Sequence, residues 1–225
     1  MLKLYGYWRS TAAYRVRIAL NIKEQPYQQE SIHLVKDGGY QHQDAFRELN
    51  PQGLVPVLTD NDFTLHQSLA IIDYLEEKFA TPSFLPQKTT DRAVVRAMAY
   101  DIACDIHPLN NLRVLQYLTK SLNTEDFAKN RWYQHWIATG FGAFEKRLSQ
   151  LMQVGQLSLN PDNEPKFCWG DTPTVADICL IPQVYNAHRF DVDMSPYPLI
   201  SAINAHCLTI NAFKQATPEN QPDAH

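Results

Sequence analysis

A strand passes directly into a helix within the stretch YGYWRSTAAYRVRIAL, residues 5–20. The letters LKLYGY at residues 2–7 alternate and include aromatics, which is typical of a strand, and residues 11–22 carry apolar side chains at helical spacing. Ser10 or Thr11 is an ordinary cap at the start of a helix. Arg9 is unexpected there, because a helix N-terminus already carries partial positive charge. The pattern therefore indicates a junction at which an anion binds.

The rest of the first 80 residues predicts short strands and helices in alternation. The expected elements are a strand in PYQQESIHL (26–34), a helix in DAFREL (44–49), a hairpin of LVPVLTD (54–60) and FTLHQ (63–67), and a helix in SLAIIDYLEEKF (68–79). Crossover rules make the first two strands parallel and add the hairpin antiparallel. This order of elements is that of a thioredoxin-like domain.

Beyond residue 80 the sequence predicts helices only. A proline-containing linker at residues 81–88 separates a domain of residues 1–80 from a domain of residues 89–225. Helical patterns recur in the second domain at residues 89–120, 124–151, 174–189, 196–206 and 208–216. The predicted fold class is α/β plus all-α, with an N-terminal thioredoxin-like domain followed by an all-helical C-terminal domain.

The composition of the 225 residues excludes several classes of protein. The formal net charge of −4 is spread evenly along the chain, which argues against nucleic acid as a partner. No signal peptide is recognisable, and no apolar stretch approaches the roughly 18 residues of a membrane span. The four cysteines show neither CxxC nor zinc-ligand spacing, so we expect no metal and a reduced, cytoplasmic protein.

Three features of the first domain suit an anionic peptide ligand. At the helix start, where redox members of this fold carry CxxC, the chain reads Ser-Thr-Ala-Ala; a hydroxyl of Ser10 or Thr11 could hydrogen-bond a bound thiolate. Val55-Pro56 is a candidate cis bond that would expose backbone to a peptide. Gln67 and Ser68 begin a helix and suit a carboxylate. Capping alone would also explain the serines, but the three features together describe glutathione.

In the second domain, Thr174 and Asp177 have the spacing of a capping box, which is a structural motif. Pro108 is expected to bend its helix near Cys104, with His107 and Asn111 sharing one face beside Arg113. A lone helix histidine is more often structural, although this polar group at a bend resembles the wall of a cleft. The default interpretation of Arg189 is a surface ion pair with a following aspartate.

The sequence resembles the zeta class of glutathione S-transferases along essentially its whole length. The resemblance rests on residues 10–20, LNPQGLVPVL, HQSLAIIDYLEE, TVADICLIPQVYNAHRFDVD and YPLI. It implies a glutathione-dependent maleylacetoacetate isomerase of tyrosine and phenylalanine breakdown, active as a homodimer on a dianionic cis-diacid. In such an enzyme the thiolate adds to the double bond, rotation follows and glutathione is regenerated. Bacterial relatives acting on maleylpyruvate are the alternative, followed by a broader glutathione transferase and by a non-catalytic scaffold.

The resemblance also assigns roles to individual residues. Ser10 matches the serine that steadies the thiolate and Thr11 a second serine, while Ala12 replaces the cysteine of the family motif. Arg9 and Arg189 match arginines positioned for the substrate's carboxylates. The positions that match glutathione contacts are Ser10, Thr11, Arg15, Gln41, Val55, Gln67, Ser68, His107, Asn111, Leu112 and Arg113.

Overall fold

The computed structural model describes residues 1–224, which form two compact units. The first unit consists of Met1–Ser83 together with the chain from Thr209 onward, and the second of Phe84–Leu208. The sequence prediction assigned residues 89–225 to the second domain. The structure differs because helix α9, Asn211–Ala216, packs against α1, Thr11–Ile22, in the first unit.

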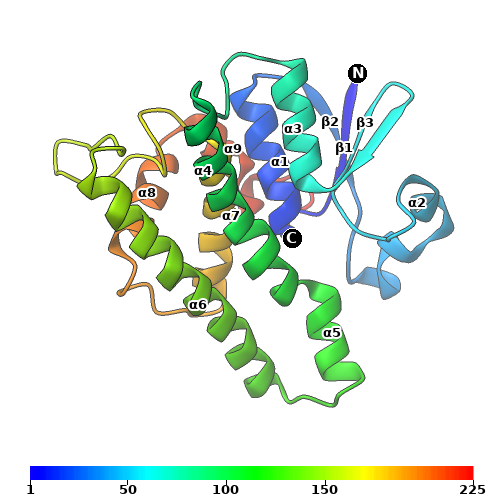
Figure 1. Ribbon diagram of the computed structural model, residues 1–225. Helices are drawn as coiled ribbons and strands as arrows, with labels where there is room; N and C mark the ends of the chain where they lie inside the picture. The colour runs from blue at the N-terminus through cyan, green and yellow to red at the C-terminus, as the bar shows by residue number, and fades with distance from the viewer. Residues whose placement is uncertain (225) are drawn as a thin grey trace. The chain divides into compact units, whose positions relative to one another are not determined.

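A four-stranded sheet organises the first unit (Figure 1). Its order is β2-β1-β3-β4, formed by Leu2–Gly6 (β1), Tyr27–Ser31 (β2), Val57–Asp60 (β3) and Phe63–His66 (β4). Strand β1 runs parallel to β2 and antiparallel to β3, and β3 continues into β4 as a hairpin. The predicted thioredoxin-like topology is confirmed.

Helices cover this sheet and fix the position of the β1–α1 junction. Figure 1 shows α1 and α3, Ser68–Lys78, on one side of the sheet and the short α2, Asp44–Leu49, on the other. Every residue of α1 from Thr11 to Leu20 is buried. The polar atoms of its buried face therefore need partners, and α9 supplies two: Arg17 Nε donates to Ala216 O at 3.0 Å, and Asn21 Nδ2 donates to Ala212 O at 2.9 Å.

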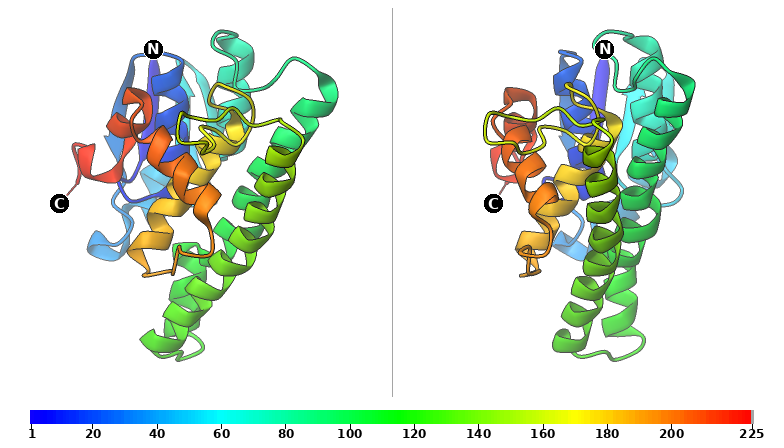
Figure 2. Two further views of the ribbon diagram at one scale, coloured as in Figure 1. Left: turned by 90° about the vertical axis from the view of Figure 1, so that its left-hand side faces the viewer. Right: turned by 60° about the vertical axis from the view of Figure 1, so that its left-hand side comes forward.

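The second unit is helical, as predicted. Its regular helices are α4, Thr89–Tyr100; α5, Leu112–Lys120; α6, Asp126–Gln153; α7, Val175–Arg189; and α8, Pro198–Cys207. Helix α7 forms the centre of this unit, since most of its residues are buried and it contacts both α4 and α8. Figure 2 shows α6 as the long helix of the unit, with α5 beside its N-terminal part.

The prediction of one continuous helix over residues 89–120 is wrong. Helix α4 widens into a π-helical turn, Asp101–Ile106, and then tightens into a 3₁₀ turn, His107–Asn110. Asn111 has extended backbone (φ −64°, ψ 146°), so the helix stops there and α5 starts anew. Pro108 lacks the N–H that an uninterrupted helix requires, which accounts for the disruption near Cys104 that the sequence did predict.

Candidate active site

Ser10 caps helix α1 at the point where β1 ends. Its backbone is extended (φ −70°, ψ 115°), and its Oγ accepts a hydrogen bond from Ala13 N at 3.2 Å. A hydroxyl has one proton to donate as well as lone pairs to accept with, so this cap leaves the proton available. Ser10 is half-buried, whereas Thr11 is 6% exposed. Ser10 is thus the more accessible hydroxyl beside the positive end of α1.

Arg9 brings an uncompensated positive charge to the same junction. Its guanidinium carbon lies 4.4 Å from the centre of the Trp8 ring, and Nη2 donates to the Tyr7 hydroxyl at 3.2 Å. Within residues 1–224, no carboxylate lies at ion-pair distance from Arg9. Sequence reasoning did not identify Tyr7 and Trp8 as the residues that hold this arginine. The junction attracts anions through both the guanidinium and the helix.

The peptide bond between Val55 and Pro56 is cis, as predicted, and lies just before β3. Gln67 adopts a positive φ of 73° immediately before α3, a conformation that strains a residue other than glycine and is often retained for function. Ser68 is the first residue of α3 and is buried. Its Oγ accepts from Arg15 Nη1 at 3.4 Å, so Arg15 lies behind Ser68 in the core.

Gln41 lies in a short 3₁₀ helix, Tyr40–His42, that the sequence did not predict. It is 5% exposed, and its Nε2 donates to Leu34 O at 3.1 Å, within its own loop. A Cβ on Gly39 would approach the Gln41 side chain to 2.5 Å, and Gly39 also has a φ of 98°. Glycine at position 39 therefore permits the buried position of Gln41, whose Oε1 is buried too and has no hydrogen-bond partner among residues 1–224.

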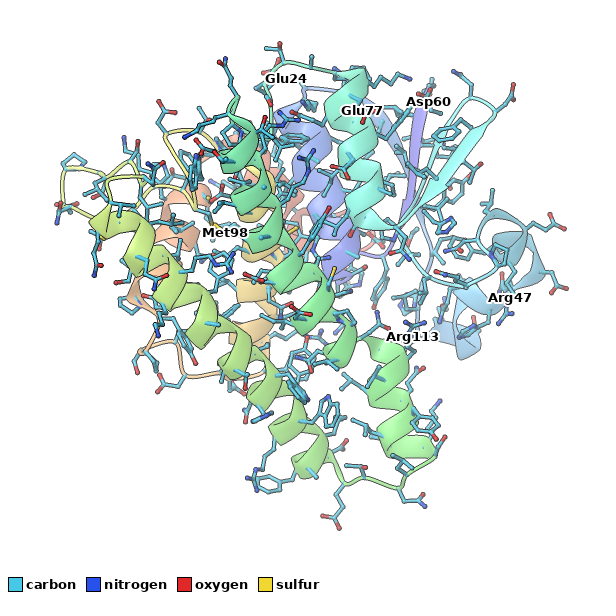
Figure 3. The ribbon with its side chains drawn as sticks, in the orientation of Figure 1. Glu24, Arg47, Asp60, Glu77, Met98 and Arg113 are labelled. Carbon is cyan, nitrogen blue, oxygen red and sulfur yellow. The ribbon has the colours of Figure 1, made fainter. Side chains whose placement is uncertain are left out.

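The second unit holds the other predicted contacts. Asn111 caps α5, since its Oδ1 accepts from Arg113 N at 3.1 Å, and Leu112 is the first residue of that helix. Figure 3 shows Arg113 on the first turn of α5, and its side chain is exposed. His107 is half-buried in the preceding 3₁₀ turn. The helical face that His107 and Asn111 were predicted to share is absent, because the helix ends at Asn111.

Arg189 is the last residue of α7 and is exposed. The default interpretation as an ion pair with Asp191 or Asp193 is wrong: within residues 1–224, no carboxylate lies at ion-pair distance from Arg189. Its guanidinium lies 5.1 Å from the Phe190 ring centre instead. Asp193 accepts from Ser195 N at 2.9 Å, and this hydrogen bonding lowers the pKa of its carboxyl.

The polar groups at the helix N-termini of the first unit match the anionic groups of glutathione. A half-exposed hydroxyl at a helix N-terminus suits a thiolate, and a second helix N-terminus with Ser68 suits a carboxylate. Within the described residues, no group of three or more His, Cys, Asp or Glu side chains could hold a metal ion. No helix in that part of the chain is both long and apolar enough to cross a membrane.

Comparison with known proteins identifies the family of this chain. Residues 4–83 match the model of the glutathione S-transferase N-terminal domain. A probable maleylacetoacetate isomerase of Vibrio cholerae is 52% identical to this chain. The alignment covers 99% of this chain and 98% of the Vibrio protein.

Two solved structures support the same assignment. A holo structure of a bacterial maleylpyruvate isomerase, described as a zeta-class glutathione S-transferase, superposes with a TM-score of 0.90 at 45% identity, over 99% of this chain and all of the other. A maleylacetoacetate isomerase of Methylobacterium extorquens with bound malonate and glutathione superposes with a TM-score of 0.89 at 38% identity, over 99% of both chains. The chain therefore belongs to the maleylacetoacetate isomerase family, the zeta class of the glutathione S-transferases.

Proposed function

We propose that this protein is a glutathione-dependent cis–trans isomerase that converts maleylacetoacetate to fumarylacetoacetate in tyrosine and phenylalanine breakdown. The observation that carries the proposal is the β1–α1 junction, where the available Ser10 hydroxyl adjoins the uncompensated Arg9. A scaffold protein needs neither feature, whereas an enzyme that handles a thiolate and a dianionic substrate needs both. The protein acts in the cytoplasm, as a homodimer.

Bound glutathione supplies a thiolate that adds reversibly to the substrate's double bond, which allows the bond to rotate. Ser10 donates a hydrogen bond to the sulfur, and the N-terminus of α1 stabilises the same negative charge. Thr11, at the next position, is the alternative donor. Arg9 and Arg189 each bind one carboxylate of the substrate and orient its reacting carbon. Arginine and backbone donors also stabilise negative charge that develops beside the carbonyl.

The rest of the glutathione molecule is held by residues away from the sulfur. The backbone of Val55, before the cis proline, pairs with the peptide, while Gln67 and Ser68 bind the γ-glutamyl end with Arg15 behind them. Gln41, in the loop after β2, makes a weaker contact. The proposed contacts from the second unit are His107, Asn111, Leu112 and Arg113.

Maleylpyruvate is the alternative substrate, because the superposed holo structure belongs to a maleylpyruvate isomerase. Both compounds are cis-diacids with the same anionic ends, so the arginines do not distinguish them. A broader glutathione transferase acting on small electrophiles is the next alternative.

The decisive experiment measures kcat/KM for both cis-diacids with and without glutathione, in the purified full-length chain. We expect glutathione-dependent isomerisation of maleylacetoacetate with the higher kcat/KM. A higher value for maleylpyruvate would reassign the substrate. Conjugation of a chloronitrobenzene in the absence of either isomerisation would indicate a general transferase.

A further inference from the structure

The residues of the proposed catalytic junction form a tight turn. Ser10 N donates to Tyr7 O at 2.9 Å, so Tyr7 and Ser10 are the ends of a β-turn whose central residues are Trp8 and Arg9. The orientation of this turn determines where the Arg9 side chain points and how Ser10 enters helix α1.

The segment that follows helix α9 reaches this turn from more than 200 residues along the chain. Trp8 N donates to Oδ2 of Asp223 at 3.1 Å. The same oxygen accepts from Ser31 Oγ at 2.7 Å, and Oδ1 accepts from Gln29 Nε2 at 3.3 Å. The half-buried carboxylate of Asp223 thus joins the turn to the end of strand β2, using charge-assisted hydrogen bonds that are stronger than neutral ones.

The carbonyl of Trp8 is bound by Arg17 of helix α1, which also binds the end of α9. Arg17 Nη2 donates to Trp8 O at 3.0 Å, and its Nε donates to Ala216 O at the end of α9 at 3.0 Å. Arg17 is 1% exposed, so this guanidinium is a fixed bridge inside the first unit. Both polar groups of the Trp8 backbone are therefore bound by groups that α9 and the following segment supply or orient.

We propose that Asp223 is a positioning residue of the active site: its carboxylate holds the turn from Tyr7 to Ser10, and through it Arg9 and Ser10, in the conformation needed for thiolate stabilisation. The Arg9 guanidinium lies over the Trp8 ring, so a displacement of Trp8 displaces the positive charge as well. Asp223 acts through Trp8 and does not contact glutathione or the substrate. This inference deepens the proposed function and depends on it for the roles of Arg9 and Ser10.

The first test needs no ligand and compares amide hydrogen exchange at Trp8 in the wild type and in Asp223→Ala, Asp223→Asn and Ser31→Ala. We expect Asp223→Ala to accelerate exchange at Trp8 by about tenfold or more, because the acceptor of that N–H is removed. Asp223→Asn retains an acceptor oxygen and should stay near the wild type. Ser31→Ala is the matched control, since it removes a bond to the same carboxylate and leaves the Trp8 contact. Unchanged exchange in Asp223→Ala would overturn the proposal.

The second test measures the thiolate absorbance of bound glutathione against pH, together with kcat and the KM for glutathione. Asp223→Ala should raise the apparent pKa of the bound thiol and lower kcat by about three- to tenfold, with the KM for glutathione changed less than about twofold. In Asp223→Asn, the pKa of the bound thiol and kcat should both stay close to their wild-type values. An unchanged pKa and kcat, or equal effects from Ser31→Ala, would show a purely structural role and overturn the proposal.

These measurements separate failure of this inference from failure of the proposed function. The exchange rate at Trp8 is defined without substrate, and the thiolate absorbance requires only that glutathione binds. If the wild type binds glutathione but isomerises neither cis-diacid, the proposed reaction is wrong, whereas the exchange and absorbance results still decide the role of Asp223.

Discussion

At the scale of single residues, Ser10 satisfies two interpretations that the sequence left open. Its oxygen accepts from Ala13 N as an N-cap, and its proton remains available for a ligand. Capping and thiolate stabilisation are therefore compatible functions of one hydroxyl. Thr11 is less suited to the second function, because it is 6% exposed inside the first turn of α1.

Ser10→Ala removes both the cap and the donor. We expect the free energy of unfolding to fall by roughly 0.5–2 kcal/mol, the usual cost of losing an N-cap. Turnover should fall about tenfold or more, since one hydrogen bond to a charged group is worth roughly 1.5–3 kcal/mol. Thiolate absorbance of bound glutathione at neutral pH, measured in Ser10→Ala and Thr11→Ala, identifies the donor. Loss of absorbance in Thr11→Ala alone would assign the role to Thr11.

At the scale of secondary-structure elements, the start of helix α7 is held by several buried hydrogen bonds to Asp177. Both oxygens of Asp177 are used: Oδ2 accepts from Thr174 N and from Thr174 Oγ1, each at 2.8 Å, and Oδ1 accepts from Cys168 N at 2.7 Å. Asp177 is fully buried. The predicted capping box is confirmed, and it also ties α7 to the chain segment that precedes it.

Thr174→Ala should reduce the free energy of unfolding by roughly 0.5–2 kcal/mol through the loss of a cap. Asp177→Ala should reduce the free energy of unfolding by roughly 1–3 kcal/mol beyond the reduction in Thr174→Ala. The reason is that it leaves the buried N–H groups of Cys168 and Thr174 without acceptors. Urea unfolding of the two variants measures the difference. The KM for glutathione of the folded protein should stay constant. A change in that KM without a change in the unfolding midpoint would contradict the structural assignment.

At the scale of the whole molecule, the chain crosses between its two units twice, because the segment from Thr209 onward belongs with the first unit. The two arginines proposed to bind the substrate lie in different units, Arg9 at the β1–α1 junction and Arg189 at the end of α7. Within residues 1–224, neither has a carboxylate at ion-pair distance. Each guanidinium is therefore available to an anionic ligand.

Arg9→Met and Arg189→Met should each depress kcat/KM for a dianionic cis-diacid far more than for a neutral chloronitrobenzene, because only the diacid gains charge-assisted hydrogen bonds. Arg9→Lys and Arg189→Lys should recover part of the loss. Arg147→Met is the matched control: Arg147 forms a partly exposed ion pair with Asp101 at 3.4 Å, and such pairs are worth about 0–1 kcal/mol. Equal losses on charged and neutral substrates would show that the arginines do not bind the carboxylates.

The sequence by itself determined the features that depend on neighbours within about a turn of helix or a hairpin. Apolar periodicity located the strands and helices of the first unit, and the order of elements fixed their topology. Residue chemistry at element ends located the Ser10 cap, the cis Val55-Pro56 bond and the capping box of Thr174 and Asp177. Each of these signals is contained in a few consecutive residues, which is why it could be identified without a structure.

The tertiary structure alone decided the features that join distant segments. Helix α9 belongs with the first unit, and Asp223 hydrogen-bonds to Trp8 across 215 positions, a contact that no local spacing encodes. The break at Asn111 also escaped prediction, because the apolar periodicity of residues 89–120 favoured one continuous helix. Where distant segments meet, burial and hydrogen-bond satisfaction in the folded chain decide which contacts form, as the contacts of Asp223 and of α9 show.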